Sequence, residues 1–157
     1  MKINILVGTM TGTAQMCAQE MELALDGDEV KVAILLMDKL EPAVFDDREA
    51  AYLICTSTYG QGDVPDNAKK FYADLSTRRP ALGHVRYGVF GLGDRTYAET
   101  YNFGGKRFDE ILQALGAERI GERYTNDASS GTLPEEIAVE WAQQWVEKVR
   151  ERLAQTA

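Results

Sequence analysis

The strongest constraint on the fold is a pattern that occurs three times, an apolar run followed directly by a glycine-rich turn. The runs are Ile3 to Val7, Ala51 to Thr56 and Tyr87 to Phe90. Each turn leads into a stretch whose apolar residues recur at helical spacing, and runs that are apolar throughout are typical of strands covered by helices on both faces. The chain is therefore expected to be an α/β protein with a parallel sheet.

The remaining segments extend the alternation. A β-branched and leucine-rich run from Val30 to Met37 predicts another strand, and a short strand is expected near Arg119 to Gly121. This gives five parallel strands wound on both sides, in a single domain over residues 1–157. The apolar stripes of the four expected helices are Ala14, Cys17, Ala18, Met21 and Leu25; Ala68, Phe71, Tyr72 and Leu75; Phe108, Ile111, Leu112 and Leu115; and Ala138, Trp141, Trp145 and Val149.

Residues at the helix ends carry their own signals. Gly27 and Gly116 follow the first and third stripes, where a glycine commonly ends a helix in the left-handed conformation. Asp66 or Asn67 is expected to cap the second helix with its side chain. Pro134 suits the first position of the last helix.

Composition narrows the class of protein. The formal net charge of −8 argues against a surface for nucleic-acid phosphates and favours docking on positively charged proteins. Cys17 and Cys55 both lie in apolar patterns, which predicts buried thiols rather than a disulfide or a metal site. A single histidine, His84, leaves little for a metal site or a Ser-His-Asp triad. With no apolar segment of signal or membrane-spanning length, a cytoplasmic location is expected.

The first turn, Gly8 to Thr13, has the features of a phosphate site. Two glycines and three threonines lie between a strand and a helix N-terminus, where free N–H groups and the positive helix end favour an anion. A nucleoside-triphosphate loop would need lysine after Gly12, and a dinucleotide loop would need a third glycine. A terminal monophosphate fits better, and an ordinary strand-to-helix turn with threonine caps remains the alternative.

The second and third turns each bring a tyrosine beside glycine-rich sequence. Tyr59 lies in the turn after the Ala51 to Thr56 run, and Tyr97 in the turn after the Tyr87 to Phe90 run. Loops that follow neighbouring parallel strands meet at one edge of the sheet, so two rings could enclose a flat ring between them. The combined pattern favours a flat ring with a phosphate tail, and two half-buried loop tyrosines remain the alternative.

These three stretches together resemble the FMN loops of the flavodoxin family. They are Gly8 to Ala14, Thr56 to Asp63 and Phe90 to Tyr97. The second stretch and the Pro65 to Asn67 segment are also similar to the FMN domains of diflavin reductases and to short flavodoxins of the MioC-like type. The resemblance implies a flavodoxin-like doubly wound sheet of five parallel strands in the order 2-1-3-4-5, with FMN as cofactor and no metal.

The resemblance also implies a set of cofactor-binding residues. The phosphate would be held by the first turn, the ring would lie between Tyr59 and Tyr97, and the Gly60 carbonyl would turn toward N5 in the semiquinone. Asp94 would meet the pyrimidine edge with the backbone of Leu92 and Gly93, whereas Tyr101 and Asn102 belong to the site without an assigned role. Gln61 stands where the family often carries an acidic residue. The full set is Thr9, Met10, Thr11, Gly12, Thr13, Ala14, Thr56, Ser57, Thr58, Tyr59, Gly60, Gln61, Gly62, Gly91, Leu92, Gly93, Asp94, Tyr97, Tyr101 and Asn102.

The function implied is that of a low-potential one-electron carrier, with no catalytic residues of its own. It would be a short-chain, monomeric flavodoxin that takes electrons from an NADPH-dependent flavodoxin or ferredoxin reductase and passes them to acceptor enzymes. Its acidic docking face would include Asp63, Asp66, Asp94 and Glu99.

The alternative is an NAD(P)H-dependent quinone or nitro reductase on the same fold, for which the chain offers no obvious segment to complete a nicotinamide pocket. A phospho-receiver domain would need an aspartate where Thr56 stands.

Overall fold

The computed structural model describes residues 1–9, 12–57, 64–93, 103–127 and 133–156. Its strands are β1 (Lys2–Gly8), β2 (Lys31–Leu36), β3 (Ala50–Ser57), β4 (Arg86–Gly93), β5 (Glu118–Arg119) and β6 (Tyr124–Asp127). Its α-helices are α1 (Thr13–Leu25), α2 (Lys69–Arg78), α3 (Phe103–Ala114) and α4 (Pro134–Thr156). Short 3-10 turns form η1 (Met37–Lys39), η2 (Pro42–Asp46) and η3 (Asp66–Ala68).

The strands form one sheet in the order β2-β1-β3-β4-β5, with β6 also paired to β4. All recorded pairings are parallel, which confirms the predicted doubly wound sheet and its order. The fifth position differs from the prediction because two short strands share it. β5 pairs with Arg86 and Tyr87 at the start of β4, and β6 pairs with the end of β4 from Phe90 to Gly93. Gly121, at a φ of 75°, lies in the turn between them.

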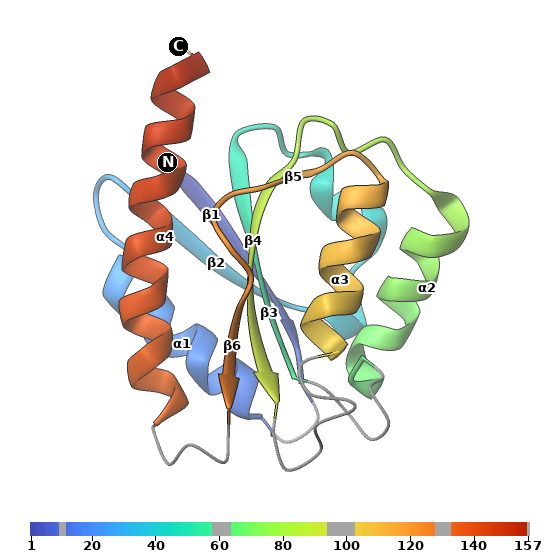
Figure 1. Cartoon of the computed structure of the whole chain (residues 1–157), viewed down its shortest axis with the longest axis horizontal. Coiled ribbons are helices and arrows are strands. Elements are labelled where there is room, and N and C mark those ends of the chain that lie inside the picture. The colour runs from blue at the N-terminus through green and yellow to red at the C-terminus, as the bar shows by residue number, and fades with distance from the viewer. Residues whose placement is uncertain (10–11, 58–63, 94–102, 128–132, 157) are drawn as a thin grey trace.

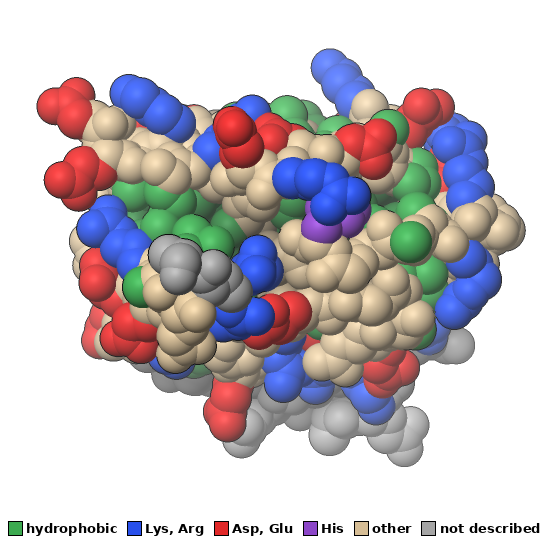
Figure 2. All heavy atoms as spheres, turned by 90° about the horizontal axis from the view of Figure 1, so that it is seen from above, with side chains coloured by type: hydrophobic (Ala, Val, Ile, Leu, Met, Phe, Trp, Pro, Cys, Tyr) green, Lys and Arg blue, Asp and Glu red, His purple; other side chains and the backbone are tan. Residues whose placement is uncertain are grey.

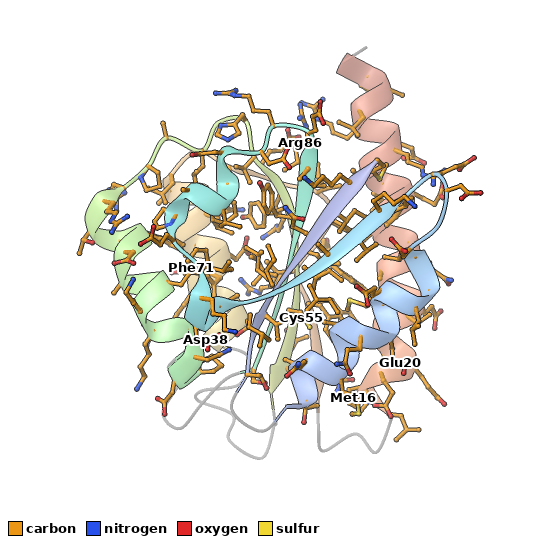
Figure 3. All side chains as sticks on the ribbon, turned by 180° about the vertical axis from the view of Figure 1, so that it is seen from behind. Met16, Glu20, Asp38, Cys55, Phe71 and Arg86 are labelled. Carbon is orange, nitrogen blue, oxygen red and sulfur yellow. The ribbon has the colours of Figure 1, made fainter. Side chains whose placement is uncertain are left out.

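Helices cover both faces of the sheet (Figure 1), with α1 and α4 on one face and α2 and α3 on the other. Alternate residues of β1 enter the two cores, as the period of a strand requires: Ile5 and Val7 pack with α1 and α4, and Leu6 packs with α2 and α3. In the view from behind (Figure 3), Phe71 of α2 points into the second core and Cys55 of β3 lies within the sheet. The predicted helical stripes are confirmed as core.

The last helix is placed by a close contact with the sheet. A Cβ atom at Gly88 of β4 would lie 2.2 Å from Nε1 of Trp145, so the glycine makes room for this indole. Trp145 stacks on Trp141 of the same helix, with ring centroids 6.1 Å apart and planes inclined by 10°. Trp141 contacts Phe90 at 5.6 Å, and Phe90 stacks on Tyr124 of β6 at 5.3 Å. A continuous row of rings therefore joins α4 to β4 and β6.

The helix ends agree only in part with the prediction. Gly116 has a φ of 99° after α3, which confirms its left-handed stop. The same prediction for Gly27 is wrong, because α1 ends at Asp26 in an extended conformation with a φ of −69°. The Asp26 carboxylate accepts the N–H of Val32 at 2.9 Å, so a side chain joins this end of α1 to the edge strand β2.

The end of the sheet where the strands begin contains a buried ionic cluster. Asp109 of α3 is 2% exposed and accepts hydrogen bonds from the Tyr87 hydroxyl at 2.6 Å, from Arg119 and from Arg123 at 3.0 Å. Burial, together with the Asp109 carboxylate, raises the pKa of Tyr87 well above its usual range. Viewed from outside (Figure 2), this end carries interspersed acidic and basic side chains. Among the described helices, none is long and apolar enough to cross a membrane.

Candidate functional site

Four adjacent strands finish together at the opposite end of the sheet. Gly8 of β1 pairs with Thr56 of β3, Thr56 pairs with Gly91 of β4, and Gly91 pairs with Thr125 of β6. Strand order reverses between β1 and β3, because the chain passes from β1 outward to β2 and then returns to β3 on the other side of β1. This is the switch point at which open α/β sheets bind their ligands, and flavodoxin is a standard illustration of that rule.

Gly8 allows the backbone of β1 to approach its neighbours closely. An added Cβ would lie 2.6 Å from Thr56 Oγ1, 3.2 Å from Met37 Sδ and 3.3 Å from Ala68 Cβ. Contacts below 3.0 Å require some part of the structure to move, so a side chain larger than hydrogen does not fit here without a shift. The start of the first turn is thus fixed against β3, η1 and η3.

The first turn leads into α1 through a left-handed glycine. Gly12 is the N-cap residue of α1, with a φ of 93°, and the carbonyl of Gly12 accepts the N–H of Met16 at 2.9 Å. The Gly12 N–H donates to Thr9 Oγ1 at 2.9 Å, which closes the turn on itself. The N-cap residue Gly12 has no side-chain cap hydrogen bond, and Thr11 beside it lies outside the described residues, so the alternative of a turn with threonine caps stays a prediction.

The N-terminus of α1 is suited to an anion. The first helical turn of α1 carries no acidic residue, whereas the first helical turn of neighbouring α4 carries Glu135 and Glu136. Acidic side chains in the first helical turn offset the positive end of a helix, and α1 has none in its own first helical turn. Met16, 42% exposed on α1, lies at this same end of the molecule (Figure 3), whereas Arg86 lies at the other.

Asn67 has a different role from the one predicted. Neither η3 nor α2 has a side-chain cap hydrogen bond, so the capping prediction for Asp66 and Asn67 is wrong. Asn67 Oδ1 instead accepts the N–H of Thr9 at 2.7 Å, and its Nδ2 donates to the carbonyl of Val7 at 3.3 Å. No pattern of neighbouring residues indicates this contact, because the partners lie about sixty residues apart in the chain.

Of the predicted site residues, the structure describes nine. Thr9, Gly12, Thr13 and Ala14 lie at the first turn and the start of α1, and the others lie at the ends of β3 and β4: Thr56, Ser57, Gly91, Leu92 and Gly93. Thr56 is fully buried and its hydroxyl donates to the Ser57 carbonyl at 3.1 Å. The remaining predictions lie outside the described residues: Met10, Thr11, Thr58, Tyr59, Gly60, Gln61, Gly62, Asp94, Tyr97, Tyr101 and Asn102.

The structure describes one residue of the predicted acidic docking face and both cysteines. Asp66 of the expected docking face is exposed and pairs with Lys69 at 2.9 Å, whereas Asp63, Asp94 and Glu99 lie outside the described residues. Cys17 and Cys55 are buried free thiols, as predicted. Burial raises the pKa of Cys17 to about 12 and that of Cys55 well above its usual value, so both stay protonated at neutral pH. The described residues contain no group of His, Cys, Asp and Glu side chains that could hold a metal ion.

Comparison with known proteins places these observations in a family context. The flavodoxin family model matches residues 5–141. Flavodoxin YqcA of Pectobacterium carotovorum subsp. carotovorum is 39% identical over 150 residues, covering 94% of this chain and 97% of the relative. Protein MioC of Escherichia coli (strain K12) is 30% identical, covering 92% and 95%. A mutant of the flavodoxin from Pseudomonas aeruginosa superposes with a TM-score of 0.84 at 29% identity, covering 96% and 99% of the two chains.

Proposed function

Because the chain belongs to the flavodoxin family of FMN-binding electron-transfer proteins, we propose that it carries single electrons from an NADPH-dependent reductase to acceptor enzymes. Its cofactor is FMN, and the redox chemistry belongs to that cofactor. The observation that carries the proposal is the convergence of the ends of β1, β3 and β4 at the switch point, next to a helix N-terminus without acidic residues. Protein residues supply binding, exclusion of water and a surface for partners.

The described residues fit the phosphate end of FMN. Thr9 accepts the Gly12 N–H through its hydroxyl oxygen, which leaves the hydroxyl proton for an anionic acceptor. Thr13 and Ala14 belong to the first turn of α1, where backbone N–H groups point out of the helix. We assign the phosphate to these three residues together with Met10 and Thr11, and the predicted ring contacts to the segments that follow Ser57 and Gly93.

The Thr9 and Gly12 N–H groups already have partners within the protein. We therefore assign the phosphate bonds of the turn to hydroxyl protons and to the N–H groups further along the loop and helix. Charge-assisted bonds of this kind are about twice as strong as neutral ones. This suits a doubly charged monophosphate without a bound cation.

Purification and stepwise reduction test the proposal directly. We expect a yellow protein that holds one FMN and that NADPH alone reduces slowly. A catalytic amount of an NADPH-dependent flavodoxin reductase should accelerate reduction by at least about a hundredfold, because the sequence offers no obvious segment to complete a nicotinamide pocket. The reduced protein should then pass electrons to cytochrome c, with the FMN-free protein as control.

Two outcomes would contradict the proposal in different ways. A protein that binds no flavin in a titration with excess FMN would contradict the assigned site. Rapid reduction by NADPH without an added reductase would favour the alternative, a quinone or nitro reductase. Monomeric behaviour at micromolar concentration in sedimentation would fit a carrier that exchanges partners, and we include it in the proposal.

A further inference from the structure

Asn67 makes its hydrogen bonds to a distant part of the chain. A side-chain amide just before a helix commonly caps that helix, but Asn67 leaves η3 and α2 without a side-chain cap. Its amide group contacts two main-chain atoms at the end of β1, the N–H of Thr9 at 2.7 Å and the carbonyl of Val7 at 3.3 Å. One side chain thereby holds the peptide groups on both sides of Gly8.

These contacts determine how the first turn begins. The Thr9 N–H is directed at Asn67, and the Thr9 side chain receives the Gly12 N–H at 2.9 Å. A series of hydrogen bonds therefore runs from Asn67 through Thr9 to Gly12, the residue at which α1 starts. Rotation of the Thr9 peptide would break the first of these bonds and move the hydroxyl that makes the second.

Packing holds Asn67 in place for this task. The next residue, Ala68, is fully buried, and its Cβ would lie 3.3 Å from a Cβ at Gly8, so η3 lies directly against β1. Asn67 itself is half-buried, which strengthens its bonds relative to bonds in water. Both of its partners are main-chain atoms, so the contact does not depend on which side chain stands at residue 7 or 9.

We propose that Asn67 is a positioning residue for the phosphate end of FMN. It fixes the direction of the Thr9 peptide and hydroxyl, so that the first turn is formed before the phosphate arrives. The inference rests on the proposed function, since it concerns the same site. A turn formed in advance loses less conformational entropy on binding, which is the general advantage of preorganisation. Asn67 acts through Thr9 and is not assigned a contact with FMN.

The test compares FMN with riboflavin, which lacks the phosphate. Asn67→Ala should weaken FMN binding to the FMN-free protein by about tenfold or more, from the loss of two part-buried hydrogen bonds, and should change riboflavin binding by less than about threefold. Lys70→Ala is the control, because it truncates an exposed residue three positions further along the chain, whose ion pair with Asp74 lies on the surface of α2. It should change neither affinity by more than about threefold.

A double-mutant cycle separates positioning from general support. Thr9→Val keeps the shape of the side chain and removes the hydroxyl that accepts the Gly12 N–H. If Asn67 acts through Thr9, Asn67→Ala should cost little further FMN affinity in the Thr9→Val background. Fully additive losses would overturn the proposal, as would an equal loss of FMN and riboflavin binding in Asn67→Ala.

One measurement needs no variant. In the FMN-free wild-type protein, the Thr9 amide should be protected from hydrogen exchange, because it is bonded before any ligand binds. An unprotected Thr9 amide would overturn the inference even if FMN binds. Wild-type protein that binds no FMN would overturn the proposed function, whereas FMN binding with an unchanged FMN-to-riboflavin ratio in Asn67→Ala would overturn the inference about Asn67 alone.

Discussion

The two ends of the parallel sheet satisfy their polar groups in opposite ways. Where the strands begin, polar side chains bond to one another: Asp109 accepts hydrogen bonds from Tyr87, Arg119 and Arg123. Where β1, β3 and β4 end, small residues replace them, and Gly8 and Gly91 flank Thr56 in one row. The first end has its partners within the fold, and the second places two glycines and the N-terminus of α1 where three strands end.

This difference separates stability from binding along a single sheet. A buried carboxylate with three donors stabilises the fold through partners that are already present, so its loss lowers the free energy of unfolding. A glycine that permits close approach of the backbone does so because it has no side chain. An added side chain would therefore displace the loop that follows the glycine. Changes at the two ends should therefore be distinguishable by unfolding and by FMN affinity.

The largest effect is expected at the Asp109 cluster, at the end of the sheet where the strands begin. Asp109→Ala should lower the free energy of unfolding by about 2–4 kcal/mol, because the buried Tyr87 hydroxyl and two arginines lose their acceptor. Urea unfolding measures the loss. Glu110→Ala removes only an exposed pair with Lys106 on the same helix and should cost less than about 0.5 kcal/mol. Equal effects would mean that the cluster is not important for stability.

At the end of the sheet where β1 finishes, Gly8→Ala should lower the free energy of unfolding by about 1–3 kcal/mol. The reason is overpacking, since the added Cβ would lie 2.6 Å from Thr56 Oγ1. It should also weaken FMN binding, because the first turn begins at this residue. Gly27→Ala is the control, with no atom within 4 Å of the added Cβ. A stable Gly8→Ala protein with unchanged FMN affinity would contradict the close packing described here.

A smaller effect, confined to binding, is expected from Thr13→Ala. Loss of a hydroxyl bond to a charged phosphate should reduce FMN affinity by about tenfold, or about 1.4 kcal/mol, with riboflavin affinity nearly unchanged. Fluorescence titration with both ligands checks this. An equal reduction for both would place the phosphate elsewhere.

The last effect is absent at neutral pH and arises only in alkaline solution, at the end of the sheet where the strands begin. Burial raises the pKa of Tyr87 above its usual range and that of Tyr52 to about 12, so the folded protein keeps both protons more tightly than the unfolded chain does. Their stabilisation is complete below about pH 10 and decreases as the pH rises further, by at most about 1.4 kcal/mol per pH unit for each residue. Replacing both residues by phenylalanine should remove most of this slope in urea unfolding between about pH 9.5 and 11. A slope that persists in the double variant would contradict the assignment.

Local patterns predicted the elements, and long-range contacts supplied what the prediction lacked. The runs of β1, β3 and β4 and the stripes of the four helices could be recognised because each is a property of consecutive residues. β6 was not predicted, because Tyr124 to Asp127 is short and mostly polar and is a strand only through its pairing with β4. The left-handed stop predicted at Gly27 is wrong, because the chain already leaves the helix in an extended conformation at Asp26, whose carboxylate bonds to β2.

The site shows the same limit. The first turn was recognisable from its glycines and threonines, but the partner of Thr9 was not, because Asn67 reaches it from another part of the chain. Asp109 was likewise predicted neither as core nor as an ionic centre. Its position in α3 is polar in sequence, and only the fold brings Arg119 and Arg123 to it.

The row of rings that joins α4 to the sheet has an optical consequence. Both tryptophans of the chain belong to it, stacked 6.1 Å apart with nearly parallel planes. Their transitions should couple and give a strong near-ultraviolet circular dichroism signal from one place in the molecule. Trp141 contacts Phe90 of β4, and Phe90 stacks on Tyr124 of β6, so the row extends into two strands that end at the site. Indole emission should therefore be quenched by energy transfer when the yellow cofactor binds, so the protein carries its own reporter of cofactor occupancy.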